Sequence, residues 1–188
     1  TDNSIELSEE DYDANKIPAM NTSIKSVVIP YGVEEIQKYA FYNCTGLEKV
    51  VLPDGIRYLG HGIFSDCINL KEVVIPDSVV EISSWAFNNC INLQNIEFSS
   101  NVEYIGENAF NNTGYWNNEN NWVDGSLHLC HALIKANSNL IEYHLPDNIS
   151  CIASYAFENC YSLKVVEVTG NSQRIFNNCS NIELLIVK

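Results

Sequence analysis

The chain has 188 residues, of which 46% are hydrophobic, and its 24 acidic and 10 basic residues give a formal net charge of −14. This apolar content suits one folded domain, and a surface of this charge repels nucleic acids and anionic membranes, so neither is expected as a partner. No apolar run approaches the roughly 18 residues of a membrane helix, which argues against membrane insertion.

Residues 1–23 form an acidic N-terminal segment with a single basic residue, Lys16. This segment is predicted to be either a tail or a cap, and its few apolar residues leave both alternatives open. Because the chain begins at Thr1 without a signal peptide and ends just after the apolar run 184–187, we expect it to be a piece of a longer protein. Apolar residues at an uncapped end near Lys188 also make end-to-end self-association with another copy possible.

A repeat with a period of 23 residues follows this segment. An apolar residue followed by Phe recurs at Ala40-Phe41, Ile63-Phe64, Ala86-Phe87 and Ala109-Phe110. The same spacing resumes between Leu133-Ile134 and Ala156-Phe157, and a shortened step of 19 residues leads to Ile175-Phe176. A fixed period of about 20–29 residues with apolar residues at fixed offsets is the signature of leucine-rich repeats. The sequence therefore predicts one leucine-rich repeat domain of about seven units over residues 24–188.

The residues that follow each Ala-Phe pair predict where the strands lie. The spacing Leu-x-x-Val-x-Ile has the β-branched content and alternation of a short strand, which Pro53, Pro76 and Pro146 end by removing a hydrogen-bond donor. Two inward columns are predicted: Leu47, Leu70, Leu93, Leu140 and Leu163, and beside them Val50, Val73, Ile96, Tyr143 and Val166. The predicted fold is a leucine-rich repeat solenoid with short parallel strands on one face, and turns and short helical or 3-10 segments, formed by Ala-Phe-x-x-Cys, on the other.

The string Ala-Phe-x-Asn-Cys-x-x-Leu-x-x-Val-x-x-Pro-x-x-Val-x-x-Ile, nearly intact in several units, resembles the BspA-like leucine-rich repeat of bacterial surface proteins. The resemblance covers residues 24–188. It implies a secreted or cell-surface location and a role in adhesion to host proteins or to other cells. It implies no catalytic residues, because the family has none to carry over.

Seven cysteines are distributed over the chain, and their odd number does not suggest a closed set of disulfides. Five of them share one repeat position: Cys44, Cys67, Cys90, Cys160 and Cys179. Coils stacked roughly 4.8 Å apart bring these residues close together, but parallel side chains disfavour the geometry of a bridge. We therefore expect buried, reduced thiols that pack as small apolar residues.

The run His128-Leu129-Cys130-His131 raises the question of a metal site. Alternation along a strand points His128 and Cys130 to one face and His131 to the other, and no second Cys/His pair stands at zinc-site spacing. We interpret the run as an ordinary outward strand edge. The four histidines lie in different units without a nucleophile motif or a phosphate-binding loop, so neither an enzyme nor a bound metal or cofactor is expected.

Two outward columns are predicted on the strand face. The residues of the first alternate in charge, which predicts weak favourable pairs between neighbouring strands: Lys25, Glu48 and Lys71. The second is an apolar stripe formed by Val28, Val51 and Val74. The stripe is interpreted either as a contact surface or as a result of the preference of valine for strands.

The unit 109–132 departs from the repeat, because it is one residue longer, has Thr113 at the Cys position and replaces the strand consensus by an Asn-rich loop. Its aromatic residues Tyr115, Trp116 and Trp122 are a second candidate binding site, since insertions in repeat proteins project from one face and often serve binding. The alternative is that both Trp side chains fold inward and replace the missing Leu and Val of the columns.

These features predict a secreted or cell-surface binding module whose partner is a protein or a glycan. The strand face and the aromatic loop are its predicted contact surfaces, whereas Trp85, at a variable turn position, is assigned no role. The alternative function is a passive spacer or display segment without a ligand of its own. Saturable binding to any ligand distinguishes the first function from the second.

Overall fold

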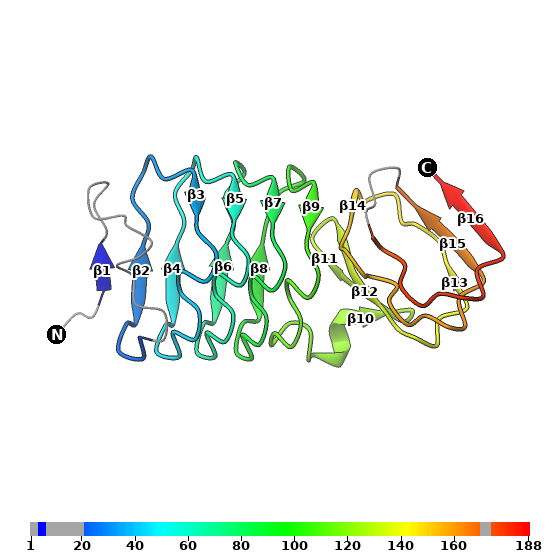
Figure 1. Ribbon diagram of the computed structural model, residues 1–188, viewed down its shortest axis with the longest axis horizontal. Coiled ribbons are helices and arrows are strands. Elements are labelled where there is room, and N and C mark those ends of the chain that lie inside the picture. Colours follow the sequence, from blue (N-terminus) through cyan, green and yellow to red (C-terminus); the bar gives the residue numbers. More distant parts are fainter. Residues whose placement is uncertain (1–3, 7–20, 170–173) are drawn as a thin grey trace.

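The computed structural model describes residues 4–6, 21–169 and 174–188, which form an elongated solenoid of short strands (Figure 1). The prediction of a tail or cap at residues 1–23 falls on a segment that lies mostly outside the described residues. Within that segment, strand β1 (Ser4–Glu6) pairs in parallel with β2 (Ser26–Val28). The first sheet therefore extends one strand beyond the first repeat.

The predicted Leu-x-x-Val-x-Ile strands form this first sheet. Its further strands are β4 (Lys49–Val51), β6 (Glu72–Val74) and β8 (Asn95–Glu97). The strands are parallel, and the register advances by one repeat at a time, so that Val27 pairs with Val50 and Val73 pairs with Ile96. The central residue of each strand is buried and its neighbours face outward, as the pleat requires.

A second parallel sheet, which was not predicted from the sequence, lies along another side of the solenoid. It contains β3 (Glu35–Ile36), β5 (Tyr58–Leu59), β7 (Glu81–Ile82) and β9 (Tyr104–Ile105). These two-residue strands come from the Val-x-x-Ile part of each unit and bury the Ile or Leu at their second position. Two residues carry too little alternation to be recognised in a sequence, but stacked coils of equal length hold them in hydrogen-bonding register.

The Ala-Phe-x-x-Cys stretch forms the third side of each coil as a series of tight turns rather than a continuous helix. The amide of Cys44 donates to the Phe41 carbonyl of its own coil at 3.2 Å, whereas the amide of Phe41 donates to the Ile63 carbonyl of the next coil at 2.9 Å. Two positions per coil have a positive φ: Tyr39, Gly62, Trp85, Asn108, Tyr155 and Arg174 at the first, and Asn43, Asp66, Asn89, Asn112, Asn159 and Asn178 at the second. A left-handed residue ends a helical turn, which is why no helix propagates here.

The core of the first half consists of columns that run through the stacked coils. One column is made of phenylalanines whose ring centroids lie 5.3, 5.4 and 5.5 Å apart: Phe41, Phe64, Phe87 and Phe110. The predicted columns are buried in the same core: Leu47, Leu70 and Leu93, and Val50, Val73 and Ile96. The predicted stacking of these coils is confirmed.

The irregular unit interrupts this stack after β9 (Figure 1). Its elements are the 3-10 helix η1 (Glu119–Asn121) and the antiparallel strands β10 (Trp122–Val123), β11 (Ser126–Leu129) and β12 (Ala132–Ala136). Strand β14 (Cys151–Ile152) pairs in parallel with β12, and beyond its end the amide of Ser154 donates to the Ile105 carbonyl of β9 at 2.8 Å. A strand from a later coil therefore joins the hairpin to the second sheet.

Strand β12 separates two cores. Ala132 and Ile134 are buried in the core of the first half, whereas Leu133 and Ala136 are buried in a second core formed by the later coils. The interpretation of the run 128–131 as an outward strand edge is therefore wrong. Apart from Cys130, which is exposed at the turn, the residues of the β11–β12 hairpin are buried or half-buried.

The hairpin also shifts the register of the later coils. The period of the sequence makes Leu133 equivalent to Ala156, but β12 pairs Leu133 with Ile152. Leu140 and Tyr143 pack in the second core, so the predicted columns run in two separate stretches rather than one. The physical reason is that the hairpin uses the residues that would otherwise form a strand of the first sheet.

The last coils form a third parallel sheet from β13 (Glu142–Tyr143), β15 (Val165–Val168) and β16 (Leu184–Val187). Figure 1 shows these coils as open rings, so their axis differs in direction from that of the first half. β16 leaves Leu184, Leu185 and Val187 about half exposed, and end-to-end self-association through this edge stays a prediction. Within the described ranges, no helix is long and apolar enough to cross a bilayer.

Candidate functional site

The valine stripe lies on the outward side of the first sheet. Val28 and Val51 are register partners, and Val74 stands one repeat further along, beside Glu97 of β8. Val28 is half-buried, whereas Val51 is 41% and Val74 65% exposed. The three valines therefore form an apolar row whose exposure increases from β2 to β6.

An open depression of about 540 Å³ surrounds the two exposed valines. Its charged lining residues are Lys49, Asp54, Glu72 and Asp77. Three acids against one base make this surface attractive to cations, in keeping with the charge of the whole chain. Asp54 and Asp77 were not predicted from the sequence, although a signal was present: they stand one period apart, each directly after a strand-ending proline.

The predicted charge pairs flank this depression. Nζ of Lys71 lies 2.8 Å from Oε2 of Glu48, and Nζ of Lys25 lies 3.6 Å from its Oε1, which confirms the predicted alternation. The hydrogen bond from Lys71 is the main reason why the pKa of the Glu48 carboxyl lies below its ordinary value. All three side chains are largely solvated, so we expect these pairs to set the local charge rather than the stability of the fold.

The aromatic loop residues Tyr115, Trp116 and Trp122 are half-buried and pack against the first core. The Tyr115 hydroxyl donates to the His128 carbonyl at 2.8 Å, and Nε1 of Trp122 donates to the Trp116 carbonyl at 2.9 Å. The two indole rings meet edge to face, with centroids 5.6 Å apart and planes at 88°. These are contacts of the inward-packing alternative, and ligand binding by the exposed parts of the rings stays a prediction.

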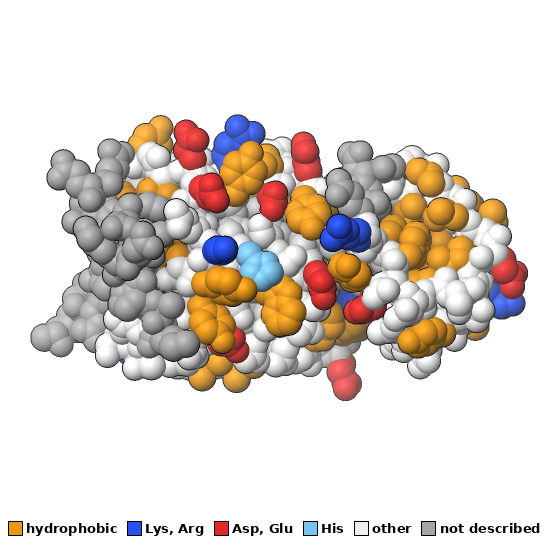
Figure 2. Space-filling model, in the orientation of Figure 1, with side chains coloured by type: hydrophobic (Ala, Val, Ile, Leu, Met, Phe, Trp, Pro, Cys, Tyr) orange, Lys and Arg blue, Asp and Glu red, His pale blue; other side chains and the backbone are white. Residues whose placement is uncertain are grey.

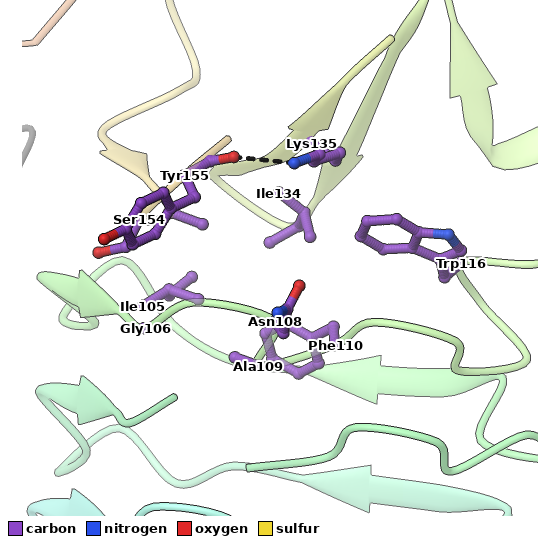
Figure 3. Close-up of a pocket in the computed structure, with 11 residues that line it drawn as sticks. Ile105, Gly106, Asn108, Ala109, Phe110, Trp116, Ile134, Lys135, Ser154 and Tyr155 are labelled. Atoms are coloured by element: carbon purple, nitrogen blue, oxygen red, sulfur yellow. Dashed lines mark hydrogen bonds between the residues drawn. The ribbon is translucent and has the colours of Figure 1, made fainter. Parts of the chain in front are cut away.

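Trp116 also borders a small cavity where the two halves of the solenoid meet (Figure 3). Ile105 lines it from β9, and Ile134 and Lys135 line it from β12. Nζ of Lys135 donates to the Tyr155 carbonyl at 3.0 Å. A volume of about 10 Å³ holds at most one water molecule, so this cavity is a packing feature of the junction rather than a substrate site.

The histidines of the run 128–131 contact different elements. Nε2 of His128 lies 3.2 Å from the Tyr143 hydroxyl, and burial lowers the pKa of His128 and raises that of Tyr143. The His131 ring instead meets Phe98 edge-on, with centroids 5.1 Å apart. Among the residues that the structure describes, no group of three or more His, Cys, Asp or Glu side chains is placed to hold a metal ion.

A family model matches the regular coils and leaves out part of the hairpin. The model of the BspA-type leucine-rich repeat region matches residues 19–120 and 132–187, with six copies of the repeat. The chain belongs to this family. Residues 121–131, between the two matched stretches, include β10 and β11, so the BspA-type pattern is interrupted where the hairpin begins.

The chain is similar to solved structures of two leucine-rich repeat proteins. A leucine-rich repeat protein from Bacteroides ovatus is 27% identical over 90% of this chain and 42% of its own, with a TM-score of 0.51. A leucine-rich repeat protein of T. pallidum is 26% identical over 86% of this chain and 68% of its own, with a TM-score of 0.48. This BspA-type chain therefore spans less than half the length of the Bacteroides protein. None of the curated proteins compared with it matches.

The repeated cysteine of the BspA-type unit has a defined role in the stack. The thiols of Cys67 and Cys90 each donate to the Phe carbonyl of the preceding coil at 3.1 Å, and in both cases burial raises the pKa of the thiol. All seven cysteines are free, and four of the five in the column are buried, while Cys179 is half-buried. In the irregular unit the hydroxyl of Thr113 donates instead to the Phe110 carbonyl of its own coil at 3.0 Å.

Trp122→Ala is expected to lower the free energy of unfolding by about 2 kcal/mol, because it removes the ring that packs against Trp116 and exposes the end of the first core. Urea denaturation of the whole chain measures the change. Val123→Ala is the matched control, since Val123 is 57% exposed and its truncation should cost no more than about 0.5 kcal/mol. Equal stability of the two variants would contradict a packing role for the loop.

Proposed function

We propose that this chain is the binding segment of a secreted or cell-surface protein, and that its strand face contacts a protein partner. The location rests on the resemblance of the repeat to those of bacterial surface proteins. The observation that carries the contact is the pair Val51 and Val74, which stays exposed within a depression lined by acidic side chains. Exposed apolar residues surrounded by polar groups are typical of protein contact sites.

The charge around the valines indicates the kind of partner. Asp54, Glu72 and Asp77 line the depression with only Lys49 to balance them. A partner that offers an apolar side chain beside Lys or Arg residues would complement this surface, whereas an acidic partner would be repelled. The aromatic loop is a weaker candidate for the contact, because the Tyr115 hydroxyl and Nε1 of Trp122 donate within the loop and the adjoining hairpin.

Val74→Lys is expected to weaken binding to the partner by about tenfold or more, because it places a flexible cation at the most exposed position of the apolar row and repels a basic partner. The measurement is surface plasmon resonance of the whole chain against purified extracellular-matrix proteins, immobilised one at a time. An exposed strand position tolerates Lys, so the melting temperature should change little.

Val123→Lys supplies the control, since it makes the same change at another exposed valine outside the stripe. Equal affinity of both variants for the partner would exclude the strand face as the contact. If the wild-type chain shows no saturable binding to any matrix protein or cell-surface extract, the spacer function replaces the proposed one.

A further inference from the structure

A cluster of aromatic side chains lies on the turn side of the first three coils. We define this turn-side cluster as Tyr39, Tyr42, His61 and Trp85. Tyr39 is 45% and Trp85 41% exposed, while Tyr42 and His61 are half-buried. Figure 2 shows hydrophobic side chains beside a histidine on this face of the molecule. The strand face contributes none of these residues, so the cluster is separate from the surface proposed above.

The ring of Tyr39 is held in a fixed position. It meets the Tyr42 ring edge-on, with centroids 5.9 Å apart, and the His61 ring likewise, with centroids 5.3 Å apart. The ring also packs directly on Gly62, where an added Cβ would lie 2.6 Å from Cε1 of Tyr39. A ring that is already ordered loses little side-chain entropy when a ligand covers it.

Two residues of the cluster have a left-handed backbone conformation. Tyr39 has a φ of 61° and Trp85 a φ of 65°, in the left-handed region that bulky side chains rarely adopt. The equivalent residues are Gly62 and Asn108 in the neighbouring coils, which tolerate this conformation, and Tyr155 and Arg174 in later coils. Bulky residues therefore hold this strained turn position in four of the six coils, and in the first three coils two of them are aromatic.

The polar atoms of the cluster are also available. The Tyr115 hydroxyl and Nε1 of Trp122, in the packed loop, each donate a hydrogen bond. By contrast, the Tyr39 hydroxyl and Nε1 of Trp85 make no hydrogen bond to any other described residue. The cluster therefore offers apolar ring faces together with unused donors at their edges.

We propose that the turn-side cluster binds a neutral oligosaccharide, with sugar rings stacked on Tyr39 and Trp85. A pyranose ring has an apolar C–H face and a rim of hydroxyl groups, which match an aromatic face with polar atoms at its edge. Tyr39 and Trp85 are two coil steps apart, on the order of 10 Å, which a short oligosaccharide can span. Gly62 stands between them in the column, and its lack of a side chain leaves room for the Tyr39 ring.

The surroundings favour a neutral sugar over other ligands. The two residues that precede Tyr39 and Trp85 are polar in both coils: Gln37, Lys38, Ser83 and Ser84. A protein contact site generally has an apolar centre that is fully desolvated, which these residues do not supply. The net charge of −14 opposes polyanionic glycans.

Tyr39→Asn and Trp85→Asn test the proposal without a risk to folding, because Asn suits the left-handed backbone and already occupies this position at Asn108. The whole chain is titrated calorimetrically with soluble oligosaccharides of β-linked glucose and of β-linked N-acetylglucosamine, and with heparin as the polyanion. The wild-type chain is expected to bind at least one neutral oligosaccharide. Each variant should bind it about tenfold more weakly, with an unchanged or raised melting temperature.

Tyr31→Asn is the matched control, because Tyr31 is 78% exposed and lies outside the cluster. It should bind the oligosaccharide like the wild-type chain, and so should Val74→Lys, which separates this site from the proposed protein contact. Full affinity of both cluster variants would overturn the proposal, and so would the lack of wild-type binding to every neutral oligosaccharide. In that second case, weaker binding of the cluster variants to a matrix protein would assign the cluster to a protein partner instead.

Discussion

Phe87→Ala is expected to lower the free energy of unfolding by about 3–5 kcal/mol, because it leaves a cavity in the middle of a closed column. The Phe87 ring is fully buried and stacks on Phe64 at 5.4 Å and on Phe110 at 5.5 Å. Neither neighbour can move into the space, since the coil spacing is set by the hydrogen bonds of two sheets and of the turns. Urea denaturation followed by far-ultraviolet circular dichroism measures the effect.

Phe176→Ala is the comparison for this variant, because Phe176 is the last ring of the second phenylalanine stack. It lies 5.4 Å from Phe157 but is only half-buried. Its removal should therefore cost about half as much or less. Similar destabilisation at both positions would mean that stability does not depend on how completely a ring is enclosed by its neighbours, contrary to the columnar core.

Gly106→Ala is expected to destabilise the chain by about 3 kcal/mol or more, although it adds only a methyl group. A Cβ at this position would lie 2.2 Å from the backbone nitrogen and 2.6 Å from Cα of Ser84 in the preceding coil. These are backbone atoms, so the coils would have to separate. Gly106 follows β9 directly, where the second sheet meets the strand from the later coils.

Gly114→Ala serves as the control for the added methyl group. The first atom that its Cβ would meet is Cγ of Gln94 at 2.9 Å, which belongs to a flexible side chain, and the nearest carbonyl oxygen lies 3.0 Å away. We expect a destabilisation of about 1 kcal/mol for this variant. The melting temperatures of the two variants, measured side by side, show which substitution destabilises the chain more. A smaller effect of Gly106→Ala than of Gly114→Ala would contradict the close approach of the coils.

The two proposed surfaces differ in what maintains them. Val51 and Val74 occupy exposed strand positions that the β-branched side chain of valine favours. Tyr39 and Trp85 occupy left-handed turn positions that bulky side chains rarely adopt, and Tyr155 and Arg174 occupy the same position in later coils. No role was predicted for Trp85 from the sequence.

Much of the first half was predictable from the sequence, because its signal is repeated. The period of 23 residues places Leu47, Leu70 and Leu93 at equivalent positions, and equivalent positions of equal coils must stack. The strands that carry Val51 and Val74 follow from β-branched alternation, and the reduced state of the cysteines follows from their column. These predictions use short-range sequence patterns that are present in each regular coil.

The second half and the turns were decided only by the tertiary structure. Strand β12 has buried residues on both faces, because it lies between two cores, and no alternation in its sequence could indicate this. The pairing of Leu133 with Ile152, the approach of β14 to β9 and the left-handed backbone at Tyr39 and Trp85 all depend on contacts between residues far apart in the chain. A repeated sequence determines its own stacking wherever the coils are alike. Where one unit differs, several arrangements satisfy the local preferences, and the packing between coils selects among them.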